Sequence, residues 1–314
     1  MKISRFWVCV AVMVAAGLLF TGVSKNEYYF NAAYVILQAT MMAVAWNILG
    51  GFTGYVNFGT AGFFAVGAYT SIALDKAWGL PLPLLILASG AVCGLIGLGL
   101  GYLTLRLKGV YFAIATLAMA IVFETLINNW SFVGGAKGAY ILTPEKHLWF
   151  ASYIEMLFMV MLLLTIACIA ISRKLNASRL GRGLAAIRDD EVAAECAGVP
   201  TLRLKLVSTT LMGAMMGVAS APYPFFVTYV DPQSAFNLVV AVNAIAMPMI
   251  GGTAHWLGPV IGALLVGTMQ EIITVTVSSE LNVLIVGVML VVFITLAPQG
   301  IVGLFQKYRS RRTP

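Results

Sequence analysis

Charge is the first thing that this chain lacks. Only 10% of its 314 residues are Asp, Glu, Lys or Arg, 61% are hydrophobic, and the mean hydropathy is +0.94. Soluble globular domains hold roughly 25% charged and 45–50% apolar residues, so this composition excludes a water-soluble domain. We expect a single transmembrane domain over residues 1–314, that is, an all-α polytopic membrane protein.

The chain is also poor in residues that build catalytic and metal sites. Its two histidines, His147 and His255, belong to no HExxH motif, and no GxSxG motif occurs, which argues against an intramembrane enzyme. No GxxxxGK(S/T) phosphate loop occurs either, so neither ATP hydrolysis nor a bound cofactor is expected of this chain. Four cysteines stand outside any CxxC or Cys/His spacing, which predicts neither a disulfide nor a metal site: Cys9, Cys93, Cys168 and Cys196.

Long apolar runs dominate the chain instead. A helix needs about 20 apolar residues to cross the hydrocarbon core of a bilayer. Ten runs are predicted to be membrane spans: 6–23, 29–49, 58–74, 84–104, 110–130, 152–172, 204–222, 238–250, 257–277 and 281–297. The first run follows Lys2 and Arg5 and lacks an A-x-A cleavage site, so we expect a retained span rather than a signal peptide.

The basic residues lie at the ends of these runs. With ten spans, Arg5, Arg106, the 172–207 loop and the tail from Lys307 all fall on one side of the membrane. An excess of Lys and Arg marks the cytoplasmic side, so both termini are expected inside the cell. The net charge of +7 therefore reflects topology, and nucleic acid is not expected as a partner.

Many of the 31 glycines follow helical spacing. Such glycines let neighbouring helix backbones approach closely in lipid, so we interpret them as packing contacts rather than as chemistry. One stripe and two small-xxx-small pairs show this spacing: Gly90, Gly94, Gly97 and Gly101, then Gly213 with Gly217, and Gly258 with Gly262.

Two further segments, 46–69 and 249–267, each place a glycine pair at the end of one apolar run and open the next run within a few residues. A glycine-interrupted pair of hydrophobic segments in corresponding halves is typical of transporters built from internal repeats. Ordinary tight turns between helices account for the same pattern. Both interpretations therefore stay open, as does the orientation of the two halves.

Polar side chains inside the spans are candidates for lining a translocation pathway, because burying them in hydrocarbon is costly. Hydrogen bonding between helices is the alternative role. Glu124 lies toward the outer end of its run, where it either reaches an external mouth or snorkels to the interface. The candidate pathway residues are Asn47, Asn57, Thr60, Thr116, Glu124 and Asn243.

Several blocks, taken in order, resemble the permease subunits of ABC importers for branched-chain amino acids, with the LivM-like branch the closer match. The blocks are GGFTGYVNFGTAGFFAVGAY (50–69), LRLKGVYFAIATLAMA (105–120), GGAKG (134–138), GRGLAAIRDDEVAAECAGV (181–199), GGTAHWLGPVIGALLV (251–266) and APQGIVGLF (297–305). The resemblance thus covers nearly the whole chain. The sister branch that carries urea and short amides is similar almost as closely.

The resemblance implies a type II ABC importer permease fold with about ten transmembrane helices and an internal repeat, in the bacterial plasma (inner) membrane. It also implies a set of partners. These are a second permease subunit, usually a different chain that completes a heterodimer, two cytoplasmic ATPase subunits that bind the ATP, and a periplasmic (extracytoplasmic) substrate-binding protein.

In that family, the polar loop between the halves holds a short coupling helix that sits in a cleft of the ATPase. Here the resemblance places it in the cytoplasmic loop 173–203. The acids at 189–191 favour a helix N-terminus, and Gly198 followed by Pro200 is a stop signal. Wound as one helix over 181–199, the segment shows no clean amphipathic stripe, so a solvated loop is the alternative. The candidate coupling residues are Arg182, Leu184, Ile187, Arg188, Asp189, Glu191, Glu195 and Gly198.

Two other functional classes remain as alternatives. A secondary transporter that works alone would need ion-coupling carboxylates in mid-span, whereas Glu124 and Glu271 lie toward the ends of their runs. A purely structural scaffold would bind the ATPases, but uptake would not change when the candidate pathway residues are replaced. The scarcity of full charges in the spans suits a zwitterionic amino acid and also neutral urea.

Overall fold

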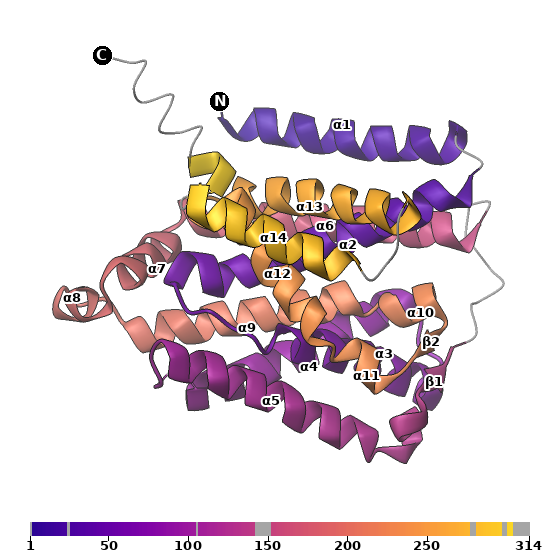
Figure 1. The fold of residues 1–314 in the computed structure, drawn as a ribbon, viewed down its shortest axis with the longest axis horizontal. Coiled ribbons are helices and arrows are strands. Elements are labelled where there is room, and N and C mark those ends of the chain that lie inside the picture. The colour runs from indigo at the N-terminus through magenta and orange to yellow at the C-terminus, as the bar shows by residue number, and fades with distance from the viewer. Residues whose placement is uncertain are drawn as a thin grey trace.

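The computed structural model of the chain describes residues 2–23, 26–104, 106–141, 152–276, 281–296 and 300–303. These residues form a bundle of helices with one small pair of strands (Figure 1). The long helices are α1 (Lys2–Val23), α2 (Glu27–Thr53), α3 (Thr60–Trp78), α4 (Leu82–Thr104), α5 (Val110–Asn128), α6 (Tyr153–Ala177), α9 (Thr201–Ser220), α12 (Leu238–Gly251), α13 (Leu257–Thr276) and α14 (Leu281–Leu296). The short elements are η1 (Ser131–Val133), η2 (Gly135–Lys137), β1 (Ala139–Tyr140), α7 (Arg179–Asp189), α8 (Glu191–Cys196), α10 (Tyr223–Val227), β2 (Tyr229–Val230) and α11 (Pro232–Ala235).

A helix lies over each of the ten predicted runs. Within the described ranges, seven stretches are both long and apolar enough to cross a bilayer: Glu27–Thr53, Leu82–Thr104, Val110–Asn128, Tyr153–Ala177, Thr201–Val227, Pro232–Gly251 and Leu257–Thr274. The apolar part of α1, Phe6–Gly22, is shorter. The helical, multi-pass architecture is therefore confirmed, whereas the count of ten spans stays a prediction.

Helix α2 runs through the centre of the bundle. Every residue from Thr40 to Thr53 is buried, and the helix packs against α6, α9, α12 and α13. It ends at Gly54, which adopts φ +78° and donates its N–H to the carbonyl of Gly50 at 3.1 Å. Glycine tolerates this left-handed conformation because it has no Cβ. The chain then runs without helix through residues 54–58 before α3 begins.

The most extensive contact between described helices joins α4 and α9, and the predicted role of their glycines in packing is confirmed there. A Cβ built on Gly97 would lie 2.7 Å from the Thr209 carbonyl oxygen, and one built on Gly213 would lie 2.6 Å from the Cys93 carbonyl oxygen. Both distances are too short for real atoms. Glycine is therefore required on both helices if their backbones are to approach this closely.

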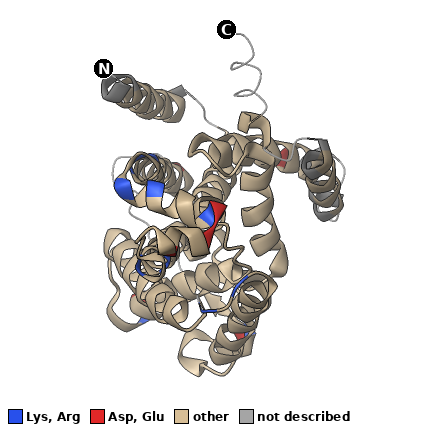
Figure 2. Ribbon diagram, turned by 90° about the vertical axis from the view of Figure 1, so that its left-hand side faces the viewer, with Lys and Arg blue, Asp and Glu red and all other residues tan. Residues whose placement is uncertain are grey.

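The loops divide between the two ends of the bundle. One end carries α7, α8, the end of α2 and the start of α9, and Lys108 of the α4–α5 connection lies there, 3.8 Å from Glu191. Figure 2 views the molecule from this end, with Lys and Arg in blue. The opposite end carries β1 paired antiparallel with β2, and Tyr229 donates its hydroxyl to the Lys137 carbonyl at 3.0 Å. The glycine-rich 134–138 block thus lies at the end opposite α7 and α8.

The two glycine-interrupted segments meet at the α7–α8 end. Asn47, near the end of α2, donates its amide to the carbonyl of Thr253 in the α12–α13 connection at 3.1 Å. A Cβ on Gly51 would lie 2.8 Å from the same carbonyl. Both segments are helix–turn–helix corners that pack against each other.

Candidate functional site

The predicted coupling segment consists of two short helices with a break between them. Asp190 is extended, and its carboxylate accepts hydrogen bonds from the amides of Val192 and Ala193 at 2.9 and 3.0 Å. It is therefore the N-cap of α8, which confirms the helix start expected from the acids at 189–191. The helix ends at Cys196, and Gly198 follows with φ +82°, so the predicted stop is also confirmed.

Helix α7 is amphipathic. This corrects the expectation that residues 181–199 form no helix with one apolar and one polar face. Gly181, Leu184 and Ile187, three residues apart, are buried against the bundle, whereas Leu180 and Arg182 are exposed. The expectation was wrong because it wound residues 181–199 as one helix. The break at Asp190 rotates the second helix out of phase with the first.

The candidate coupling residues therefore do not share one face. Leu184 and Ile187 fix α7 to the permease itself, and Arg188 lies over Gly54 at the end of α2, with its guanidinium 3.4 Å from the carboxylate of Asp189. The members that are fully open to a separate protein are Arg182, Asp189, Glu195 and Gly198.

The α8 outer face, defined as Val192, Ala193, Cys196 and Ala197, was missed by the sequence reasoning. All four residues are exposed, and Val192 is 60% exposed. Their spacing places them on one side of a helix, and the signal becomes visible once Asp190 is recognised as the helix start. An exposed apolar face at this polar end of the bundle is a candidate docking surface.

Glu191 points back into the protein instead of outward. Its carboxylate accepts a hydrogen bond from the Tyr55 hydroxyl at 2.6 Å and another from the Lys205 ammonium at 2.7 Å. Burial by itself would raise the pKa of Glu191, but these two hydrogen bonds and the charges of Lys205 and Lys108 lower it below its usual value. We call Tyr55, Glu191 and Lys205 the Glu191 junction. Tyr55 and Lys205 carry no local sequence signal for this role.

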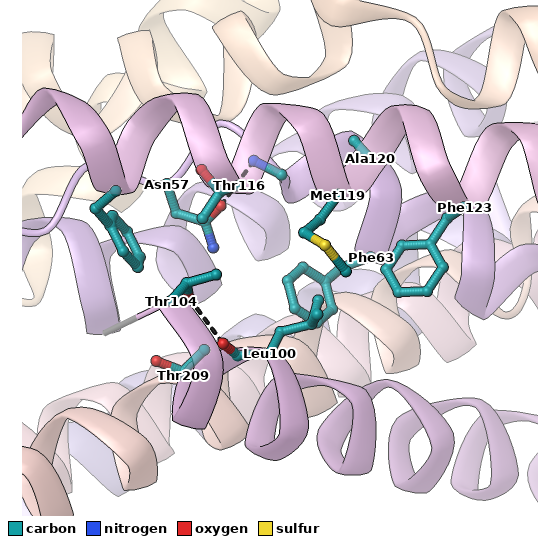
Figure 3. A pocket seen from close by; sticks show the side chains of 11 residues that line it. Asn57, Phe63, Leu100, Thr104, Thr116, Met119, Ala120, Phe123 and Thr209 are labelled. Atoms are coloured by element: carbon teal, nitrogen blue, oxygen red, sulfur yellow. Dashed lines mark hydrogen bonds between the residues drawn. The ribbon is translucent and has the colours of Figure 1, made fainter. Parts of the chain in front are cut away.

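Asn57 and Thr116, two candidate pathway residues, lie together beside a small cavity (Figure 3). The Thr116 hydroxyl accepts a hydrogen bond from the backbone N–H of Phe58 at 3.2 Å. Thr104 and Thr209 lie across the cavity from Asn57 and Thr116. We call this space the threonine cavity. Its free volume is about 10 Å³, which is about the size of a single water. As observed, it cannot hold an amino acid.

Asn243 lines a different and larger space, which we call the amide cavity. Its volume is about 210 Å³. Three side-chain amides lie on its wall, from Gln38, Asn243 and Gln270, and Gln270 donates to Asn243 at 3.3 Å. The remaining lining residues are uncharged: Val35, Ala39, Met42, Phe64, Tyr223, Ser234, Val240, Ala244 and Met247.

The other candidate pathway residues lie elsewhere. Asn47 bonds to Thr253 between the two glycine-interrupted corners, and Thr60 is buried at the start of α3. Glu124 is half-buried on α5, and neither cavity includes it. The structure thus brings Asn57 and Thr116 together at the threonine cavity, whereas none of the other four lines it, and Asn243 lines the amide cavity.

The fold is found in a solved transporter. A metal-chelate type ABC transporter in an inward-facing conformation superposes with a TM-score of 0.50 at 16% sequence identity, covering 93% of this chain and 99% of that chain. At this identity the likeness concerns the fold alone. The helical bundle, with its short helices at one end, is therefore a fold that a solved transporter also has.

Residues 28–294 match the family described as the branched-chain amino acid transport system, permease component, and the chain belongs to this family. Among its relatives is the high-affinity branched-chain amino acid transport system permease protein LivM of Escherichia coli K12, 27% identical over 286 residues, which are 83% of this chain and 67% of that protein. The corresponding LivH protein of the same strain is 22% identical over 306 residues, covering 88% of this chain and 95% of that protein. The family expected from the sequence blocks is confirmed.

Proposed function

We propose that this chain forms half of the translocation pathway of an ATP-driven importer for branched-chain amino acids in the bacterial inner membrane. The family match over residues 28–294 carries this proposal, together with relatives whose names specify that substrate class. The same names favour branched-chain amino acids over urea. The partners are a second, different permease subunit, two cytoplasmic ATPase subunits that bind the ATP, and an extracytoplasmic binding protein.

The proposed topology has ten spans with both termini in the cytoplasm. It places α7 and α8 inside the cell and the β1–β2 pair outside. The Lys and Arg residues at the ends of the apolar runs support this orientation. We also propose that α2–α3 and α12–α13 are corresponding parts of an internal repeat, which the contact between Asn47 and Thr253 supports.

The ATPase subunits dock on the α8 outer face and the exposed residues around it. An apolar face at the cytoplasmic end has no lipid to cover it, so a protein partner is the occupant that removes it from water. Arg182, Asp189 and Glu195 form a polar rim, as interfaces of this kind have. The role of α7 and α8 in this proposal is mechanical.

The solute passes through the amide cavity rather than the threonine cavity. Amide side chains offer both donors and acceptors, so Gln38, Asn243 and Gln270 can meet the carboxylate and the ammonium of a zwitterion in turn. Met42, Phe64 and Met247 supply apolar wall for an aliphatic side chain. The volume of about 210 Å³ is below the roughly 300 Å³ of typical ligand pockets. This suits a route that binds weakly and releases fast.

Asn243→Leu is expected to lower uptake about tenfold, because the route loses an amide that hydrogen-bonds to a charged group of the solute. The initial rate of leucine uptake into proteoliposomes measures this, with complex assembly checked by size-exclusion chromatography. Val242→Leu, the neighbouring position on α12 that does not line the cavity, is the matched control. Loss of the assembled complex would instead assign Asn243 to helix packing with Gln270.

We expect the complete complex, reconstituted with its binding protein, to import labelled leucine only when ATP is present on the side of the membrane that carries the ATPase subunits. Labelled urea should not be imported under the same conditions. This chain alone in proteoliposomes is expected to move neither solute. Uptake by the isolated chain would establish a stand-alone transporter, and ATP-dependent urea uptake without leucine uptake would replace the proposed substrate.

A further inference from the structure

The Glu191 junction is a buried charged cluster that is separate from the proposed docking surface on α8. The Lys205 ammonium lies 2.7 Å from the Glu191 carboxylate and 3.1 Å from the Tyr55 hydroxyl, and it also sits over the Tyr55 ring at 4.7 Å. Lys205 is only 3% exposed. Glu191 therefore faces the permease interior, although it is the first residue of the helix whose opposite side is exposed.

The junction joins two neighbouring helices to a connection that lies far from them in the sequence. Glu191 begins α8, Lys205 lies in the second turn of α9, and Tyr55 lies in the non-helical connection after α2. Burying a lysine and a carboxylate is costly unless each is paired and hydrogen-bonded, so the three groups hold one relative arrangement. Removing the Glu191 carboxylate takes away the counter-charge that accepts a hydrogen bond from the buried Lys205 ammonium at 2.7 Å. The junction therefore fixes α8 to α9 and to the connection between α2 and α3.

From Tyr55, contacts lead toward both cavities. Its ring meets the Phe112 ring edge to face at 5.1 Å, and Phe112 lines the threonine cavity. Two residues after Tyr55, the carbonyl of Asn57 accepts the indole N–H of Trp46 at 2.9 Å. Trp46 lies on α2 one turn from Met42, which lines the amide cavity.

We propose that the Glu191 junction is the internal contact that transmits movement of the motor-docked α8 to the α2–α3 connection and so to the walls of the route. Glu191 is then a positioning residue that acts on Tyr55, and it does not bind the ATPase. This inference rests on the proposed function and adds the path by which ATP-driven movement reaches the membrane interior.

The test uses the full complex with Glu191→Gln, with Tyr55→Phe, and with the exchanged pair Glu191→Lys/Lys205→Glu. The single variants are expected to keep ATP hydrolysis and motor binding while solute moved per ATP falls about tenfold, within the roughly 5–150-fold range of coupling between sites. The exchanged pair again places opposite charges at positions 191 and 205. We expect it to recover part of the wild-type amount of solute moved per ATP. Arg203→Gln, an exposed position on α9, removes one positive charge without touching the junction and is the matched control.

A second measurement does not depend on the solute. In the wild-type complex, nucleotide binding is expected to change hydrogen–deuterium exchange of residues 54–59, and Glu191→Gln is expected to abolish that change. The proposed role of the junction is overturned if Glu191→Gln keeps both the nucleotide-dependent change in exchange and the wild-type amount of solute moved per ATP. It is also overturned if the single variants lose hydrolysis, uptake and assembly equally and the exchanged pair recovers none of them. A wild-type complex that carries a solute other than leucine overturns only the proposed substrate. A wild-type complex without any nucleotide response overturns the motor-driven mechanism and the junction together.

Discussion

Gly217→Val is expected to abolish recovery of the folded permease. A Cβ at Gly217 would meet the carbonyl oxygen of Ser89 on α4 and would lie 2.7 Å from the Cys93 Cβ. The Ser89 carbonyl belongs to the backbone and cannot rotate away as a flexible side chain can. Helices α4 and α9 must therefore move apart to make room for the valine. Overpacking a close contact costs about 1–3 kcal/mol, and α4 with α9 is the most extensive helix contact among the described elements.

The yield of monodisperse protein after detergent extraction and the midpoint of thermal unfolding measure this effect. Gly99→Val is the matched control, because Gly99 lies on the exposed side of α4 and a Cβ there would meet nothing within 4 Å. Gly217→Ala should fall between Gly217→Val and the wild type. A Gly217→Val protein with wild-type yield and midpoint would show that the two helices are not in close contact.

Val192→Asp is expected to release the ATPase subunits from an otherwise intact permease. Val192 of the α8 outer face is 60% exposed, and a carboxylate there would be buried without a partner when the motor docks. Substitutions at the centre of an interface cost about 2 kcal/mol or more, which is roughly a 30-fold loss of affinity. ATP-dependent uptake should disappear with the motor.

Pull-down of the ATPase with tagged permease measures the loss directly. Leu202→Asp is the matched control, because Leu202 is also an exposed apolar residue in second position of its helix. Near a helix N-terminus an acid is favourable to the helix at both positions, so neither change should unfold its element. Motor binding that survives Val192→Asp would move the docking surface away from α8.

Several parts of this picture were predictable because their causes are local. The hydropathy of the apolar runs predicted helices over all ten stretches, and the spacing of the glycines on α4 and on α9 predicted that each helix packs closely against a neighbour. The acids at 189–191 predicted a helix start, and Gly198 followed by Pro200 predicted a helix stop, which are the limits of α8. Each of these signals depends on residues within a few turns of one another.

The candidate site was less predictable because contact partners lie far apart in the chain. Glu191 stands in a polar loop, where an acid is ordinarily expected to face water, yet its partner Tyr55 is 136 positions away. Asn57 and Asn243 are both polar residues near or within apolar runs, and nothing in their local pattern says that they line different cavities. The packing of the connection 54–58 and of α12 against distant parts of the chain decides both outcomes.

The sequence by itself determined the membrane class, the family and the helices, because hydropathy, charge and small-residue spacing are properties of consecutive residues. Only the tertiary structure decided which side of each helix faces a cavity, a neighbour or the outside. The physical reason is that a hydrogen bond such as that from Tyr55 to Glu191, or a cavity wall shared by α2, α12 and α13, forms only when distant segments are packed together.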